Sequence, residues 1–206
     1  MGKDKKWIHE RKHDLYYRKA KSEHYSSRAA YKIIQLDKKY HILPPSGWVL
    51  DLCCAPGSWM EAVTTRQPQL HVVGIDLNPV QARASQISFT RGDILSDEVI
   101  GEALRKVKKE PPIFNVIISD CAPKFSGIKE IDLYKQHELS MRVVELCRRY
   151  LVTGGHCVIK YFQGNSMDQQ ELEKNIRDAF KHLYRTKPDS SRKKSAEFYY
   201  VCMERK

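Results

Sequence analysis

Short apolar runs alternate with amphipathic stretches along most of this chain. The runs are rich in Val, Ile, Leu and aromatic residues and predict strands over residues 48–52, 70–76, 87–93, 113–120, 156–162 and 196–203. Between them apolar residues recur at helical spacing, which predicts helices over 58–66, 96–109, 131–152 and 168–182. A further helix, capped by Ser26 and Ser27, is expected before the first strand. Strands that alternate with helices predict an α/β fold, Rossmann-like and doubly wound, whose mostly parallel sheet has helices on both faces.

The chain of 206 residues is long enough for one α/β domain with its own core. It shows no internal repeat and no long linker. We therefore expect a single domain over residues 1–206, of which residues 1–25 form a basic N-terminal arm. No apolar run approaches the about 20 residues that span a bilayer, and the N-terminus lacks the apolar stretch of a secretory signal. These features predict a cytoplasmic protein without membrane contact, and we expect a monomer.

The formal net charge of +11 favours a polyanion, above all nucleic acid, as the partner. In the arm, lysines and arginines are interleaved with aromatic residues. Such a surface can neutralise phosphates and stack on unpaired bases. A second basic cluster lies at 185–194. The alternatives are that the charge serves solubility only, and that Tyr16 and Tyr17 pack on the core instead of meeting a ligand.

Six cysteines stand at positions 53, 54, 121, 147, 157 and 202. None forms a Cys-x-x-Cys pair, so neither a zinc ribbon nor a thioredoxin-type site is indicated. Most lie in apolar stretches or tight turns, and we expect all six to be reduced, as in a cytosolic compartment. His9 and His13 are one helical turn apart but have no further ligand nearby, so we expect no metal site.

A tight turn, Cys53-Cys-Ala-Pro-Gly-Ser58, follows the first predicted strand. In open α/β sheets such a turn holds nucleotide-like ligands. Because it is not G-x-G-x-x-G and contains Pro56, it suits the pyrophosphate of a nicotinamide cofactor poorly. S-adenosylmethionine carries no phosphate, and an acidic residue after the second strand, here Asp76, can bind its ribose. The turn therefore favours S-adenosylmethionine.

Charged residues stand at or just beyond the carboxyl ends of five predicted strands: Asp51, Asp76, Asp93, Asp120 and Lys160. Any one of them could be a turn former. Because these strand ends open onto one edge of a parallel sheet, the five together indicate a ligand site.

Several ordered motifs carry a family resemblance. They are Asp51-Leu-Cys-Cys-Ala-Pro-Gly-Ser-Trp59, Ser119-Asp-Cys-Ala-Pro123, Val158-Ile-Lys-Tyr-Phe-Gln-Gly164 and Ser195-Ala-Glu197, with Ser27-Arg-Ala-Ala-Tyr-Lys32 and Thr186-Lys-Pro-Asp-Ser-Ser-Arg192. From about residue 14 onward the chain resembles the RlmE/FtsJ family of RNA ribose 2′-O-methyltransferases, and it is most like the archaeal branch. The resemblance implies a seven-stranded methyltransferase sheet.

The resemblance also implies the site. The catalytic K-D-K-E tetrad of the family falls on Lys32, Asp120, Lys160 and Glu197. Its adenosylmethionine contacts fall on Gly57, Trp59, Asp76, Asp93 and Asp120. Cys53 and Ser58 stand where the family commonly has glycine. Both residues are small, so we expect the turn to keep its shape.

Transfer of a methyl group from a sulfonium to a ribose 2′-oxygen requires mainly positioning and removal of the hydroxyl proton. We expect Lys160 to accept that proton, with Lys32 as the neighbouring cation that holds the substrate. Asp120 and Glu197 would orient the ammonium groups and the hydroxyl, and no metal is needed. The alternative is that the four residues form two structural ion pairs.

Resemblance to the archaeal branch implies a uridine ribose in large-subunit ribosomal RNA as the substrate, within the large subunit or its precursor. The alternative within the same chemistry is an anticodon-loop ribose of tRNA. An alternative from a different functional class is that the protein is a non-catalytic RNA-binding factor for ribosome assembly. A nicotinamide oxidoreductase is a third reading, which the turn disfavours.

Overall fold

The computed structural model describes residues 14–107, 113–164 and 166–206. The first half of the expected basic arm, with His9 and His13, lies outside these residues, as does the end of the helix expected over 96–109. Among the helices that are described, none is long and apolar enough to cross a membrane.

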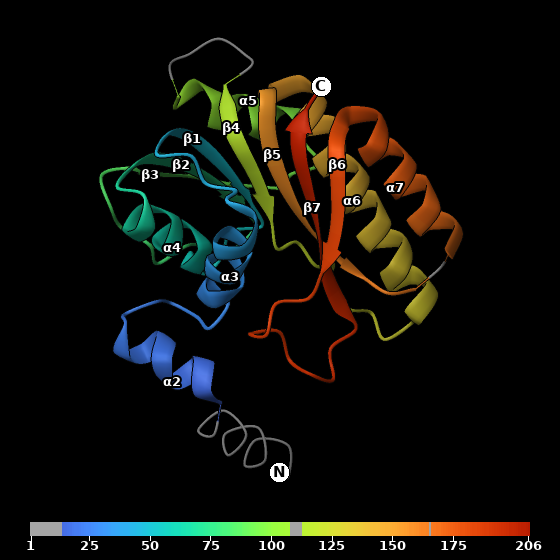
Figure 1. Ribbon diagram of the computed structural model, residues 1–206, viewed down its shortest axis with the longest axis horizontal. Coiled ribbons are helices and arrows are strands. Elements are labelled where there is room, and N and C mark those ends of the chain that lie inside the picture. The colour runs from blue at the N-terminus through green and yellow to red at the C-terminus, as the bar shows by residue number, and fades with distance from the viewer. Residues whose placement is uncertain (1–13, 108–112, 165) are drawn as a thin grey trace.

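Seven strands form one sheet, in the order β3-β2-β1-β4-β5-β7-β6 (Figure 1). They are β1 (Ser46–Leu52), β2 (Gln69–Asp76), β3 (Ile87–Arg91), β4 (Phe114–Ser119), β5 (Leu151–Phe162), β6 (Phe180–Thr186) and β7 (Glu197–Arg205). The first five strands pair in parallel, whereas β7 runs antiparallel to both β5 and β6. This confirms the expected doubly wound, mostly parallel methyltransferase sheet. The chain order reverses between β1 and β4, where open α/β sheets bind ligands.

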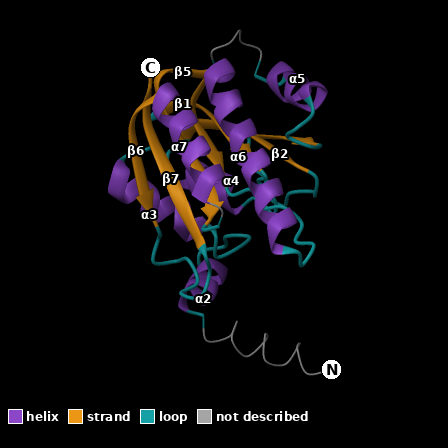
Figure 2. Cartoon of the chain, turned by 90° about the vertical axis from the view of Figure 1, so that its right-hand side faces the viewer, coloured by secondary structure: helices purple, strands orange, loops and turns teal. Residues whose placement is uncertain are grey.

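Helices cover both faces of the sheet, as Figure 2 shows from the side. They are α3 (Ala30–Tyr40), α4 (Ser58–Arg66), α5 (Asp97–Arg105), α6 (Lys129–Tyr150) and α7 (Ser166–Ala179); a further helix, α2 (Leu15–Ser22), precedes them in the chain. Successive residues of a strand face opposite sides, and β1 separates two cores in this way. Val49 belongs to the core under α3 and α4, and Leu50 to the core under α5, α6 and α7.

Helix α2 lies below α3 rather than on the sheet (Figure 1). Its attachment is polar and aromatic: Gln35 donates to the Tyr16 hydroxyl over 2.9 Å, and the Tyr16 and Tyr31 ring centroids are 5.4 Å apart. Arg28 and Asp14 form an ion pair at its start. Tyr16 therefore packs against α3. Of the two alternatives that the sequence left open for this residue, packing on the protein or contact with a ligand, the structure shows the first.

Two expected boundaries are wrong. The helix predicted over 168–182 ends at Ala179, and β6 begins at the next residue. This strand lies at the sheet edge with several side chains exposed, so its apolar pattern has no clean period. The second error concerns the boundary between the helix predicted over 131–152 and the strand predicted over 156–162. Instead α6 ends at Tyr150, and Gly154, with φ of +79°, lies inside β5 where its register with β4 shifts.

Candidate active site

The polar residues predicted at the strand ends meet at one edge of the sheet. Asp76 ends β2, Asp93 and Asp120 follow β3 and β4, and Lys160 lies near the end of β5. The strands β1 and β4 pair in register, with Leu52 opposite Ser119. This pairing joins the turn after β1 to the loop after β4 at the point where the chain order reverses.

A cavity of about 730 Å³ opens beside the ends of β1, β2 and β3, and its wall includes Asp76, Asp93 and Leu95. Asp76 accepts the N–H of Ala55 over 2.9 Å and that of Asn78 over 2.7 Å. Asp93 accepts the N–H of Leu95 over 3.0 Å. These hydrogen bonds hold the two carboxylates in place at the cavity wall, where they can accept further hydrogen bonds from a ribose or an adenine.

A smaller cavity of about 30 Å³ lies between the turn and Asp120, and Asp51 forms part of its wall. Asp51 is only 1% exposed, and neither of its carboxylate oxygens accepts a hydrogen bond from the described residues. Burial, with the negative charges of Asp120 and Asp76, raises the pKa of Asp51 well above its usual value. A buried carboxyl with free acceptors fits a cationic ligand group, and S-adenosylmethionine carries both a sulfonium and an ammonium group.

Gly57 and Trp59 serve the turn in different ways. Gly57 has φ of +112°, and a Cβ there would lie 2.7 Å from the Cβ of Ala82, so only glycine fits this position. Gly57 is not among the described residues that line either cavity; it shapes the turn. Trp59 is buried and lines the smaller cavity, and its Nε1 donates to the carbonyl of Ala29 over 2.8 Å. This bond ties α4 to the start of α3.

The four residues of the predicted tetrad come together from four separate segments. Lys32 Nζ lies 3.1 Å from Glu197 Oε1 and 3.5 Å from Asp120 Oδ1. Lys160 Nζ lies 3.2 Å from the same Asp120 oxygen and also donates to the Asp120 backbone carbonyl. Two lysines thus share one carboxylate oxygen at the rim of the smaller cavity.

Tyr199 is a fifth member of this cluster that the sequence analysis did not single out. Its hydroxyl donates to Asp120 Oδ1 over 2.6 Å, and Lys32 Nζ lies 5.4 Å from its ring centroid. Strand alternation could have found it, because Tyr199 follows Glu197 by two residues and so shares its face. Burial and the carboxylates of Asp120 and Glu197 raise the pKa of Tyr199 well above its usual value, which keeps its hydroxyl a donor.

The charge state of Asp120 follows from these contacts. Burial alone would raise the pKa of its carboxyl, but Lys160 and Lys32, with the hydrogen bond from Tyr199, outweigh burial and hold the pKa below its usual value. Asp120 is therefore a fixed negative charge between two lysines.

The cysteines differ from expectation at this site. Cys53 and Cys121 form a disulfide, with their Cα atoms 5.0 Å apart, whereas the other four are free and buried. The prediction that all six are reduced is wrong because it considered each cysteine within its own segment. The parallel pairing of β1 with β4 brings together the residues that follow the two strands. Cys53 also has φ of +60°, a conformation that favours glycine, at the position where the resembled family commonly has one.

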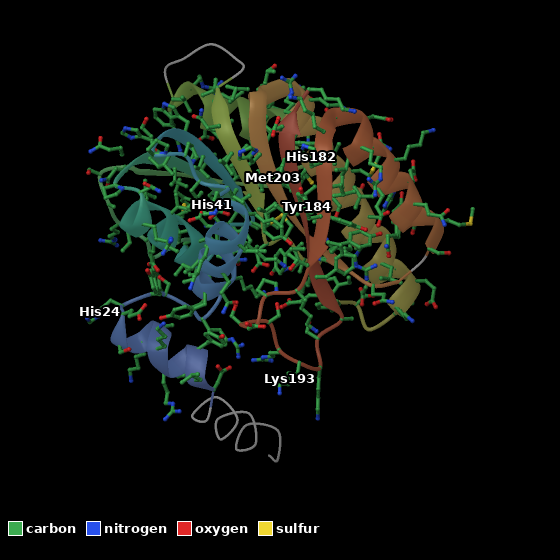
Figure 3. All side chains as sticks on the ribbon, viewed as in Figure 1. His24, His41, His182, Tyr184, Lys193 and Met203 are labelled. Carbon is green, nitrogen blue, oxygen red and sulfur yellow. A yellow bond between two sulfur atoms is a disulfide. The ribbon has the colours of Figure 1, made fainter. Side chains whose placement is uncertain are left out.

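A groove of about 480 Å³ lies between α3 and the end of β6, and Lys38, Lys39 and Lys187 line it. Tyr40 follows Lys39 directly in the chain, and its ring centroid lies 5.3 Å from that of Tyr184. Figure 3 shows Tyr184 on β6 and Lys193 on the loop that leads to β7, on the side of α2. The predicted basic segment at 185–194 therefore faces the same side of the molecule as this groove.

Within the described residues, no three His, Cys, Asp or Glu side chains gather closely enough to hold a metal ion. The charged cluster consists instead of two lysines and two carboxylates, a set that can hold an oxygen nucleophile and exchange a proton with it.

Known proteins match most of this chain. The family model of FtsJ-like methyltransferases matches residues 25–205. Among curated relatives, "Ribosomal RNA large subunit methyltransferase E" of Methanothermobacter thermautotrophicus is 40% identical and covers 98% of this chain and 93% of its own. The protein of the same name from Methanosphaera stadtmanae is 37% identical and covers 94% and 93%.

Solved structures agree on the fold. A ribosomal RNA methyltransferase from Plasmodium falciparum superimposes with a TM-score of 0.76 at 28% identity, over 88% of this chain and 98% of that one. Human methyltransferase-like protein 13, crystallised with SAH, superimposes with a TM-score of 0.61 at 11% identity, over 85% and 82%, which shows the fold alone. The match over nearly the whole chain establishes that this protein belongs to the FtsJ-like methyltransferase family.

Proposed function

We propose that this methyltransferase transfers the methyl group of S-adenosylmethionine to the ribose 2′-oxygen of a uridine in large-subunit ribosomal RNA. The observation that carries the chemistry is the contact of Lys160 and Lys32 with one oxygen of Asp120, at the rim of the cofactor cavities. The names of the archaeal relatives support ribosomal RNA as the substrate.

The cofactor is held by residues at the strand ends. Asp76 and Asp93 form the wall of the larger cavity, where the adenosine would lie. Asp51, Trp59 and Asp120 form the wall of the smaller one, on the side of the cationic groups. When bound there, S-adenosylmethionine supplies an already activated methyl group, so the protein's own task concerns the acceptor oxygen.

Lys160, as the free amine, accepts the proton of the 2′-hydroxyl at its Nζ, so that the ribose oxygen can attack the activated methyl group that S-adenosylmethionine would supply. Lys32 remains an ammonium and balances the charge of Asp120, to which it is bound. Glu197, 3.1 Å from Lys32, fixes that lysine and accepts a hydrogen bond from the ribose. A lysine held next to the hydroxyl can lower the activation barrier in two ways, by keeping the reacting groups together and by taking the proton.

The basic groove between α3 and β6 accommodates the flanking RNA. Lys32 and Lys39 lie seven positions apart on α3, about two turns, so the helix presents both to the same side. Phosphate contacts along the groove give affinity without sequence preference, and the 2′-hydroxyl as acceptor selects RNA over DNA.

Mass spectrometry of nucleosides tests the proposal directly. The purified protein is incubated with methyl-labelled S-adenosylmethionine and with ribosomal RNA, large subunits or tRNA in separate reactions. We expect labelled 2′-O-methyluridine in the ribosomal substrates. Label on a base would contradict the proposed chemistry, label confined to tRNA would contradict the proposed substrate, and cofactor binding without any transfer would indicate a non-catalytic factor.

A further inference from the structure

Two phenylalanine rings lie beside the tetrad and have no part in the mechanism above. Phe125 belongs to the loop after β4, and Phe162 is the last residue of β5. Their ring centroids are 5.7 Å apart, and the rings meet edge to face at 65°. The two rings form a pair with a defined geometry.

The position of Phe162 is set by the sheet. It pairs across strands with Glu197, and it follows Lys160 by two residues, so the three side chains share one face of the sheet. Lys160 Nζ lies 5.8 Å from the centroid of the Phe162 ring. The ring therefore borders the atom to which we assign the proton transfer.

Phe125 is 63% exposed, although phenylalanine is usually buried. The two residues before it, Pro123 and Lys124, line the larger cofactor cavity. The loop thus has the cofactor cavity on one side and the ring pair on the other. An exposed ring at such a place, next to a lysine, has the chemistry of a surface that stacks on a nucleobase.

We propose that Phe125, supported by Phe162, is the platform on which the base of the target nucleotide stacks. The proposal rests on the function proposed above, because it positions the nucleotide that is methylated. In a ribose, the carbon that bears the 2′-oxygen adjoins the carbon that bears the base. When the 2′-hydroxyl contacts Lys160, the base must therefore lie close to that lysine, where Phe162 and Phe125 offer the aromatic surface.

The platform gives the enzyme a hold on the target nucleotide itself. Phosphate contacts fix the strand but allow it to slide by a nucleotide. A ring that receives one base fixes which ribose stands at Lys160. Because every base has a stacking face, the platform positions the nucleotide and leaves the choice of sequence to other contacts.

Three variants separate stacking from general contact with the loop. Phe125→Leu removes the ring but keeps the side chain apolar, Phe125→Tyr keeps the ring, and Ile128→Ala removes another exposed apolar side chain, 53% exposed, from the same loop. We expect Phe125→Leu to raise the KM for RNA about tenfold, the loss expected for one stacked base. Phe125→Tyr and Ile128→Ala should stay near the wild type, and calorimetry should find the same affinity for S-adenosylmethionine in all four proteins.

A second experiment removes the base instead of the ring. An RNA whose mapped target nucleotide is abasic, but keeps its 2′-hydroxyl, is compared with the intact RNA on wild type and Phe125→Leu. If the base stacks on Phe125, loss of the base should lower kcat/KM strongly for the wild type. It should lower kcat/KM only slightly for Phe125→Leu, because the two changes remove the same contact. If loss of the base lowers kcat/KM by the same factor in both proteins, the two changes act independently and the proposal is wrong.

Failure of this inference can be told from failure of the proposed function. If the wild type transfers no methyl group to any RNA ribose, the proposed function is wrong. If the wild type is active and Phe125→Leu is equally active with an unchanged KM, only the platform is wrong.

Discussion

Tyr199 donates its hydroxyl hydrogen to Asp120 Oδ1 over 2.6 Å, from a strand that runs against the direction of its neighbour β5. The same carboxylate oxygen receives Lys32 and Lys160. Tyr199 therefore orients the carboxylate that orients both lysines, and it acts on the reaction through Asp120.

The Tyr199→Phe substitution keeps the ring and removes only this hydrogen bond. A hydrogen bond to a charged group contributes about 1.5–3 kcal/mol, so we expect kcat to fall by about tenfold or more. The affinity for S-adenosylmethionine should stay near that of the wild type. Tyr200→Phe is the matched control, because that hydroxyl donates over 2.6 Å to Glu173, away from the tetrad. Equal kcat values for Tyr199→Phe and the wild type would show that Asp120 needs no support from β7.

Lys160→Ala tests the proton acceptor. Loss of a positioned base lowers rates by about 10²–10⁴-fold, and we expect transfer of labelled methyl to RNA to fall by at least that much while cofactor binding persists. The control is Lys174→Ala, an exposed lysine of α7. If Lys160→Ala retains turnover, the proton leaves by another route.

Asp51→Asn tests the buried carboxyl beneath the turn. The pKa of Asp51 is raised in the folded protein, so between the ordinary carboxyl pKa of about 4 and the raised value the folded state holds a proton that the unfolded state has lost. The free energy of unfolding must therefore fall as pH rises through this window, by up to about 1.4 kcal/mol per pH unit from this group. The asparagine variant lacks this titration, so its unfolding free energy should depend less on pH.

The same variant should bind S-adenosylmethionine about tenfold more weakly, because the buried carboxyl can give up its proton when the cationic groups bind beside it, whereas an amide cannot ionise. Denaturant unfolding from pH 5 to 8 and calorimetry measure the two effects. Identical pH dependence in both proteins would mean that Asp51 is ionised in the fold.

The disulfide predicts a difference between oxidised and reduced protein. Cys53 and Cys121 are separated by 68 positions, and closing a loop of that length stabilises a fold by about 4 kcal/mol in the chain-entropy model. We expect reduction to lower the denaturant midpoint and to weaken cofactor binding, because the bond joins the two loops of the cofactor site. Peptide mapping without reductant should find the linked pair. Alkylation of both thiols in the native, unreduced protein would contradict it.

The groove between α3 and β6 predicts a salt-dependent affinity for RNA. Each phosphate contact on a single strand contributes about 0.7 to the slope of log K against log salt. The double substitution Lys38→Ala/Lys39→Ala should therefore lower the magnitude of the slope by about 1.4. Lys181→Ala is the control, since that lysine is paired with Glu204 over 3.0 Å on the same sheet edge. If the double substitution leaves the slope unchanged, RNA does not bind at this groove.

The position of the site could be predicted from the sequence because the features that indicate it are local or recur along the chain. Polar residues recur at strand ends, and a parallel sheet gathers such ends at one edge whatever the loops do. Asp76, Asp120 and Lys160 needed only the correct assignment of strands. The family motifs supplied Lys32 and Glu197, which the strand-end pattern alone would not have joined to them.

What the sequence could not provide depends on pairing between distant segments. The disulfide requires the register of β1 against β4, and the role of Tyr199 requires β7 to lie beside β5. The strand β6 has little apolar periodicity because Phe180 alone among its side chains is fully buried and most of the others are exposed. The exposure of Phe125 cannot be read from composition, since most phenylalanines are buried.

The antiparallel insertion of β7 between β5 and β6 has a consequence for synthesis of the chain. Lys32, Asp120 and Lys160 leave the ribosome before Glu197 and Tyr199, and β6 can join the sheet only through β7, which lies between it and β5. A nascent chain that stops before this strand can hold the cofactor loops but lacks one carboxylate and the tyrosine of the cluster. Methylating activity should therefore require that β7 has been synthesised and has entered the sheet.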